Sequence, residues 1–115
     1  MAFKVSSQVT GDVVSMTLVG ELDASSAGAF KSEIDKAVGQ SPRSLVLELK
    51  DLTFMASAGL RVLIYAKQKL GSGVSLYAVA PQDGIVSTLR MTGFDKSVYI
   101  VDQPPPPTPD TGRRT

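Results

Sequence analysis

Short runs in which apolar and polar residues alternate open the chain, and they predict two β-strands. The runs cover residues 3–9 and 13–19 and are separated by Thr10, Gly11 and Asp12. Because side chains on a strand alternate between its two faces, every second residue of the second run lies on one apolar face. These residues are Val14, Met16 and Leu18. The short spacer suits a turn between antiparallel strands, so we expect a hairpin.

Apolar residues then recur every three or four positions in three stretches, which is the spacing of an amphipathic helix. The helices are predicted at residues 24–38 and 58–70, and from Pro81 to about Gly93. Mainly apolar segments predict further strands at residues 45–49, 74–79 and 98–101. Residues 50–56 are expected to form a loop, and either Asp23 or Ser25 is expected to cap the first helix.

The predicted order of elements is β-β-α-β-α-β-α-β, which indicates an α/β fold with one mixed sheet and about three helices. The first two strands pair antiparallel, and the later strands run parallel because each is reached through a helical crossover. At 115 residues the chain is long enough for one hydrophobic core. We therefore expect a single domain over residues 3–101.

The composition changes after this domain. Pro104 to Pro107 are four consecutive prolines, and Pro109 follows closely. Prolines and small polar residues cannot build a core, so residues 102–115 are expected to form a disordered, polyproline-type tail. Docking of these prolines in an aromatic-lined groove is the alternative.

The residue types that are absent exclude several kinds of chemistry. The chain has no cysteine and no histidine, which removes disulfides, thiolate nucleophiles, imidazole bases and the usual zinc ligands. We therefore expect no enzyme, no cofactor and no metal site. The net charge of +1 gives no support for nucleic-acid binding. Without a secretory signal or a run of about 20 apolar residues, the chain is expected to be cytoplasmic and not inserted in a membrane.

Ser57 lies where the strand at residues 45–49 is followed, after a short loop, by the second predicted helix. In a parallel sheet this junction lies at the carboxyl edge, where ligands and partners usually bind. The free backbone N–H groups and the dipole of a helix N-terminus favour an anion. Two roles are open for the Ser57 hydroxyl: a helix cap that contributes about 1 kcal/mol, or the acceptor of a phosphoryl group.

Three groups of residues follow one another along the chain: Gly20-Glu21-Leu22-Asp23, then Phe54-Met55-Ala56-Ser57-Ala58-Gly59-Leu60, then Pro81 with Leu89 and Thr92-Gly93-Phe94. In order and spacing they resemble the STAS domain of bacterial anti-sigma factor antagonists. The resemblance implies a STAS-type fold and a protein that, when unphosphorylated, binds an anti-sigma factor and so releases the sigma factor. It also implies that this anti-sigma factor is a serine-protein kinase of the histidine-kinase-like ATPase type that phosphorylates Ser57. A serine phosphatase would reverse the modification, which completes a partner-switching cycle.

The resemblance further implies a docking surface for the partner around Ser57. Its residues are Glu21, Leu22, Asp23, Ser25, Phe54, Met55, Ala56, Ala58, Gly59 and Arg61. Leu22 is expected to be an exposed apolar anchor, Glu21 to form an ion pair, and Arg61 to pair with phosphate or with a partner carboxylate. Solvated side chains and a helix cap are the alternative roles for these polar residues. The protein is expected to be a monomer or a weak dimer.

The chain departs from the family's phosphorylation motif, Asp-Ser-Ser-Gly or Asp-Ser-Thr-Gly, on both sides of Ser57. Ala56 stands in place of the aspartate, and Ala58 stands in place of the second hydroxyl residue. Two other functions stay open. One is a STAS subunit of another assembly, such as a stress-signalling complex or a lipid-transport ATPase. The other is a small enzyme or nucleotide-binding module that holds phosphate at the helix N-terminus.

Overall fold

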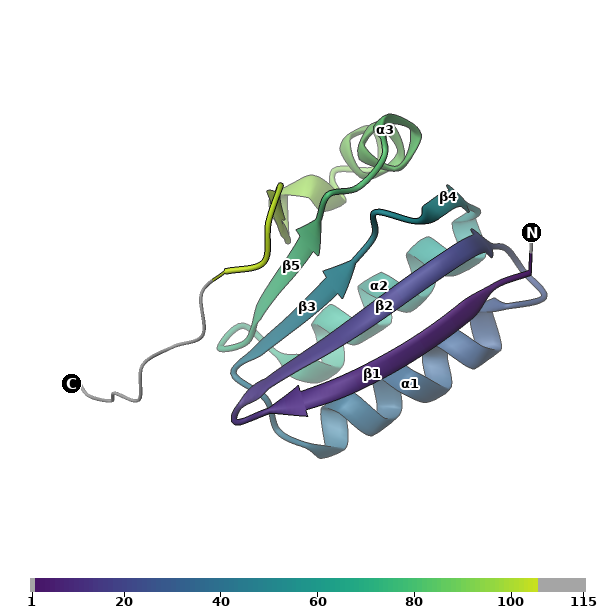
Figure 1. Ribbon diagram of the computed structural model, residues 1–115. Helices are drawn as coiled ribbons and strands as arrows, with labels where there is room; N and C mark the ends of the chain where they lie inside the picture. Colours follow the sequence, from purple (N-terminus) through teal and green to yellow (C-terminus); the bar gives the residue numbers. More distant parts are fainter. Residues whose placement is uncertain (1, 106–115) are drawn as a thin grey trace.

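A mixed sheet organises the computed structural model, which describes residues 2–105 (Figure 1). Its strands are β1 (Lys4–Thr10), β2 (Val13–Leu22), β3 (Ser44–Glu48), β4 (Leu52–Met55), β5 (Ser75–Val79) and β6 (Tyr99–Val101). Its helices are α1 (Ala27–Gly39), α2 (Ser57–Leu70), α3 (Asp83–Met91) and the short 3₁₀ turn η1 (Phe94–Lys96).

The strand pairing confirms the predicted fold class. β1 and β2 form the antiparallel hairpin, and the main sheet has the order β1-β2-β3-β5-β6. The pairs β2–β3, β3–β5 and β5–β6 are parallel, because α1, α2 and α3 each carry the chain back to the starting edge of the sheet.

One strand, β4, lies where the sequence analysis expected a loop. It pairs in parallel with the end of β2, with Gly20 opposite Leu52 and Leu22 opposite Met55. The first half of β2 pairs with β3 instead, so β2 passes from one partner to the other. The register shifts after Gly20, whose φ is +95°, and a side chain there would collide with the backbone of Ala2. Glycine therefore permits the bend that opens β2 toward β4.

Two predicted helix starts were wrong by two or three residues. α1 begins at Ala27 rather than at residue 24, because the N–H groups of Ser26 and Ala27 both bond to the carbonyl of Asp23 and form a turn before the helix. α3 begins at Asp83 rather than at Pro81, and Gln82 precedes it with extended backbone.

β2 continues beyond the predicted end at residue 19, because its alternation of buried residues extends to Leu22.

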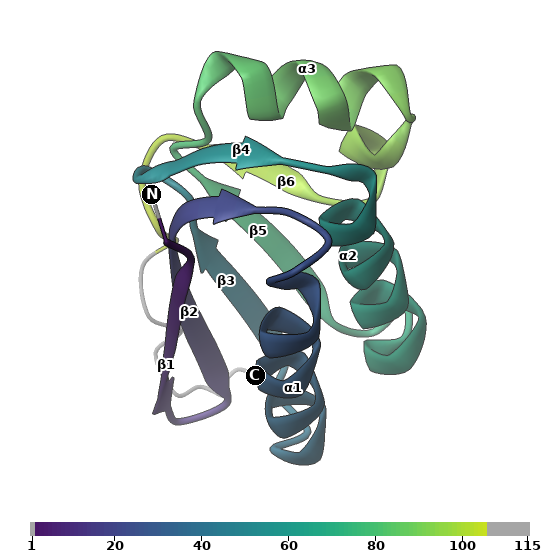
Figure 2. The same ribbon diagram turned by 90° about the vertical axis from the view of Figure 1, so that its right-hand side faces the viewer.

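α1 and α2 lie side by side on one face of the sheet, and Figure 2 shows both helices on the same side of the strands. The predicted apolar face of β2 packs beneath them, together with the leucines of β3. The core includes Val14, Met16, Leu18, Leu45, Leu47, Leu76, Ala78, Phe30, Ile34, Leu63 and Ala66. α3 lies beyond the carboxyl edge of the sheet and packs against β4. The opposite face of the sheet carries no helix in the described part of the chain.

The last strand of the described structure lies close to the end of the domain predicted from the sequence. β6 ends at Val101, and residues 102–105 have no regular secondary structure. The rest of the predicted tail, residues 106–115, lies outside the described residues, so its disorder stays a prediction. Among residues 2–105 no helix has the length and apolar character that a membrane span requires.

Candidate partner-docking site around Ser57

The junction between β4 and α2 holds Ser57 at the molecular surface. Ser57 is the first residue of α2, and Ala56 before it is the N-cap residue. The N–H of Ala56 donates a hydrogen bond of 2.8 Å to the carbonyl of Leu22, which fixes the junction against β2. The Ser57 side chain is exposed, and its hydroxyl makes no hydrogen bond with any residue from 2 to 105. Of the two roles left open for this hydroxyl, the helix cap therefore has no support in the structure.

The first turn of α2 presents free donors beside Ser57. The N–H groups of Gly59 and Leu60 bond to the carbonyl of Ala56 at 3.0 and 3.2 Å. In the described structure the N–H groups of Ser57 and Ala58 have no backbone or side-chain acceptor. Unpaired N–H groups at a helix N-terminus carry partial positive charge, so the position favours an anion over a cation.

The two segments predicted to form the docking surface lie next to each other. β4 places Phe54 opposite Glu21 and Met55 opposite Leu22. The hydroxyl of Thr53 adds a bond of 3.1 Å to the carbonyl of Gly20. The loop after β2 and the start of α2 are thus held together by backbone pairing, although about thirty residues separate them in the sequence.

Leu22 is buried, which corrects the prediction that it is an exposed anchor. Its exposed fraction is 0%. It faces the core because it continues the row of every second residue in β2, and α2 covers it at Gly59. Met55 and Gly59 are also buried, so these three residues shape the site from below. The exposed apolar side chain of the predicted set is Phe54, which is 49% exposed.

Hydrogen bonds order the loop that follows β2. One carboxylate oxygen of Asp23, Oδ1, accepts bonds from the hydroxyl and the N–H of Ser25, at 2.7 and 3.0 Å, and from the N–H of Ser26 at 3.2 Å. The Ser26 hydroxyl also lies within bonding distance of Oδ1, at 3.1 Å, and accepts from the N–H of Asp23. The hydroxyls of Ser25 and Ser26, followed by their N–H groups, lower the pKa of Asp23, while desolvation opposes them.

Neither Asp23 nor Ser25 is the cap residue of α1. Ser26 occupies the N-cap position, and its side chain bonds back into the loop rather than into the helix. Sequence reasoning missed Ser26. Serine is among the preferred N-cap residues, but the predicted helix start at residue 24 placed Ser26 inside the helix.

Charged and half-buried residues complete the predicted set. Arg61 lies one turn after Ser57 on α2, is exposed, and has no ion pair with any described residue. Glu21 and Ser25 are exposed, whereas Asp23, Ala56 and Ala58 are half-buried. Met91, at the end of α3, is 84% exposed and was not singled out by the sequence.

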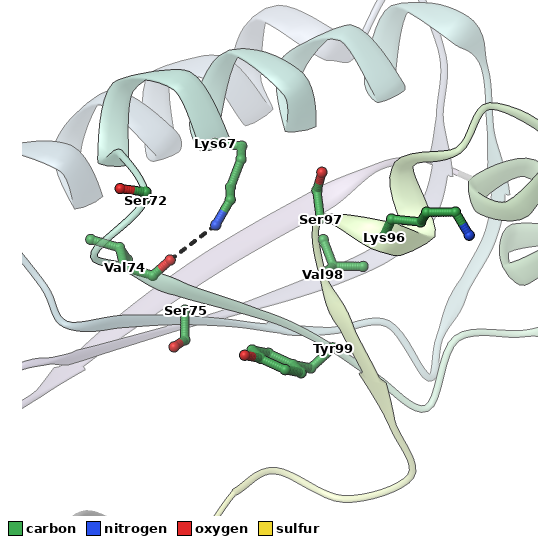
Figure 3. Close-up of a pocket in the computed structure, with 8 residues that line it drawn as sticks. All are labelled: Lys67, Ser72, Val74, Ser75, Lys96, Ser97, Val98 and Tyr99. Carbon is green, nitrogen blue, oxygen red and sulfur yellow. Dashed lines mark hydrogen bonds between the residues drawn. The ribbon is translucent and has the colours of Figure 1, made fainter.

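Residues 2–105 contain no group of three or more acidic side chains that could hold a metal ion. A pocket of about 290 Å³ lies at the far end of α2 from Ser57, between that helix and the starts of β5 and β6 (Figure 3). Two lysines line it, but Lys67 donates a bond of 3.2 Å to the carbonyl of Val74, and Lys96 points away from Lys67. The two ammonium groups do not converge on one phosphate position, so the pocket gives no support to a nucleotide site.

Comparisons with known proteins agree with the fold. The model of the STAS domain family matches residues 4–108. In sequence the chain is 29% identical over 88 residues to the anti-sigma-F factor antagonist RsfB of Mycobacterium tuberculosis, and the match covers 76% of this chain and 72% of that protein. In structure it is similar to an anti-sigma factor antagonist from Mycobacterium paratuberculosis, with a TM-score of 0.81, 26% identity, and coverage of 89% and 87% of the two chains.

A more distant solved structure shares the fold alone. It is the Bacillus cell fate determinant SpoIIAA in its phosphorylated form. The TM-score is 0.66 at 22% identity, and the match covers 86% of this chain and 90% of that chain.

Proposed function

Because the chain belongs to the STAS domain family, we propose that it is an anti-sigma factor antagonist whose docking surface is switched by phosphorylation of Ser57. The observation that carries the proposal is the exposed Ser57 hydroxyl at the N-terminus of α2, with no hydrogen bond to any described residue. The similarity to RsfB and to the paratuberculosis antagonist supports the same function. SpoIIAA in its phosphorylated form supports the idea that this fold accommodates a phosphate.

In its unphosphorylated form the protein docks on the anti-sigma factor and so frees the sigma factor. The exposed ring of Phe54 supplies apolar contact. Glu21 adds a negative charge and Arg61 a positive charge to the exposed surface that meets the partner. Aromatic residues and arginine are the side chains that most often dominate interface energies. The buried residues Leu22, Met55 and Gly59 hold this surface in one shape, which lowers the entropy lost on docking.

The anti-sigma factor then acts as a serine kinase of the histidine-kinase-like ATPase type. The Ser57 oxygen forms a new bond to the γ-phosphorus of ATP, the bond from that phosphorus to the β-phosphate oxygen breaks, and ADP leaves. The hydroxyl proton passes to a base of the kinase. A serine phosphatase restores the hydroxyl by hydrolysis, which releases inorganic phosphate.

The added charge changes binding without a change of fold. Phosphoserine carries about −1.5 to −2 charges at neutral pH. At the start of α2 this charge is favourable by about 0.3–1 kcal/mol, because the N–H groups of Ser57 and Ala58 at that helix end have no other acceptor in the described structure. In a docked contact that excludes water, an unmatched charge costs several kcal/mol, and every 1.4 kcal/mol is about tenfold in affinity. The modified surface therefore loses its partner while the domain stays folded.

The test is to incubate the purified chain with its anti-sigma factor and ATP and to map the phosphorylated peptide. The expected result is one phosphate per chain, on Ser57. Ser57→Ala should abolish incorporation, whereas the matched variant Ser87→Ala, at an exposed serine on α3, should leave it unchanged. Phosphate on another residue, or incorporation into Ser57→Ala, would overturn the switch. If the chain neither binds the anti-sigma factor nor becomes phosphorylated, a STAS subunit of another assembly is favoured instead.

A further inference from the structure

The side chain of Val46 is buried, although it lies on the face of the sheet that no described helix covers. Its neighbours in β3, Leu45 and Leu47, belong to the core beneath α1 and α2, and Val46 points to the other side. Even so, Val46 is only 2% exposed. In register it lies between Ser15 of β2 and Tyr77 of β5. Its burial therefore comes from groups on this open face of the sheet and not from the two-helix layer.

The segment after β6 lies at this place. A groove of about 390 Å³ on this face is lined by Val46 and Tyr77, by the β1–β2 turn, and by Pro104 and Pro105. Figures 1 and 2 show the chain leaving β6 on the side of the sheet opposite α1 and α2. Pro105, the last residue that the structure describes, is half-buried there. Ten further residues follow it, beginning with Pro106 and Pro107.

We propose that this groove is a polyproline-binding site and that its occupant is the chain's own proline segment, which enters the groove along Pro104 and Pro105. Proline segments are ordered at low entropic cost and dock in grooves that have an aromatic wall. Tyr77 provides that wall, and its ring is held by stacking on Tyr99, with ring centroids 5.1 Å apart. The groove volume lies within the usual range of ligand pockets, so it has room for the prolines that follow Pro105.

The docking site is separate from the switch around Ser57. The groove lies at the amino ends of the parallel strands, beside the turn at Asp12 and the start of β3 at Ser44. Ser57 lies at the carboxyl edge, where β4 enters α2. The proline segment thus shields an apolar strip of the sheet and leaves the partner surface open, so this inference does not depend on the proposed function.

The experiment compares the full chain with a variant that ends at Gln103, using the backbone amide spectrum in solution. We expect shifts at Ser15, Val46 and Tyr77 when the segment is removed, with Phe54 unchanged as the internal control. A synthetic peptide of residues 104–115 should restore the original positions of the shifted signals in a saturable way. The same peptide with serine in place of the prolines at 104–107 should bind at least about tenfold more weakly. The full chain should not respond to either peptide.

Three results would overturn this site. The first is that the signals of Val46 and Tyr77 are identical in the full and shortened chains. The second is that the serine peptide binds as well as the proline peptide. The third is that the signals of the full chain depend on protein concentration, which would identify a second copy as the occupant. Phosphorylation of the shortened chain at Ser57 is measured in parallel and should be unchanged, so the failure of one proposal is distinguishable from the failure of the other.

Discussion

The close contact between Gly59 and Leu22 predicts how much stability the protein loses in the variant Gly59→Ala. In Gly59→Ala the added Cβ would lie 2.6 Å from both Cγ and Cδ2 of Leu22 and 3.3 Å from Cγ of Met55. Carbon atoms in good contact are about 3.5–4.0 Å apart, so the overlap with Leu22 is on the order of 1 Å. Leu22 is fully buried and cannot turn into solvent. Overpacking of this kind costs about 1–3 kcal/mol.

A matched glycine separates this cost from helix propensity. Alanine is a better helix former than glycine by up to about 1 kcal/mol, which offsets part of the overpacking. Gly28 lies in the first turn of α1, is exposed, and has no atom within 4 Å of an added Cβ. Gly28→Ala should therefore show the gain alone, and the difference in unfolding free energy between the two variants isolates the clash at Leu22.

The assay is urea denaturation followed by circular dichroism. Gly59→Ala should be less stable than Gly28→Ala by about 1–3 kcal/mol. For a domain of this size the difference corresponds to at least about 4 °C in melting temperature. Equal stabilities of the two variants would show that the start of α2 does not rest on Leu22. The rigid support that we assign to the docking surface would then be refuted.

Three further predictions concern residues of the same site. Leu22→Ala should lower the free energy of unfolding by about 2–5 kcal/mol, because it leaves a cavity under α2; a loss below 1 kcal/mol in urea denaturation would contradict its burial. Phe54→Ala should change stability by less than about 1 kcal/mol but weaken binding to the anti-sigma factor in calorimetry, and unchanged affinity would remove Phe54 from the interface. The carboxylate of Asp23 has a lowered pKa, so its stabilisation is complete above the ordinary aspartate pKa and is lost as the pH falls through the folded value. The stability advantage of the native chain over Asp23→Asn should accordingly shrink on acidification from neutral pH, and a constant difference across that pH range would refute the role of the serine bonds.

The sequence predicted the main sheet and the three helices because burial imposes their periods. Val14, Met16 and Leu18 occupy every second position because one face of β2 meets the helices, and this alternation of apolar residues can be recognised from the sequence alone. β4 was missed because only four residues form it, and their burial runs buried, exposed, exposed, buried, which carries no alternation. Its pairing depends on the bend at Gly20, which is a tertiary feature.

The candidate site was predicted in its location and only partly in its surface. The strand-to-helix junction placed Ser57 correctly at the start of a helix. Leu22 was misplaced because the resemblance drew attention to its loop, although the alternation from Val14 onward already assigned it to the core. The start of α1 was misplaced because hydrogen bonds between Asp23 and Ser26 prolong the turn, and such bonds leave no periodic signal.

The most direct test of the central claim is the affinity for the anti-sigma factor before and after phosphorylation of Ser57. The two forms of the same purified chain can be separated by charge and titrated in calorimetry under identical conditions. The account predicts that the phosphorylated form binds at least about a hundredfold more weakly, since an unmatched charge in the interface costs several kcal/mol, while both forms melt at similar temperatures. Equal affinity of the two forms would contradict it.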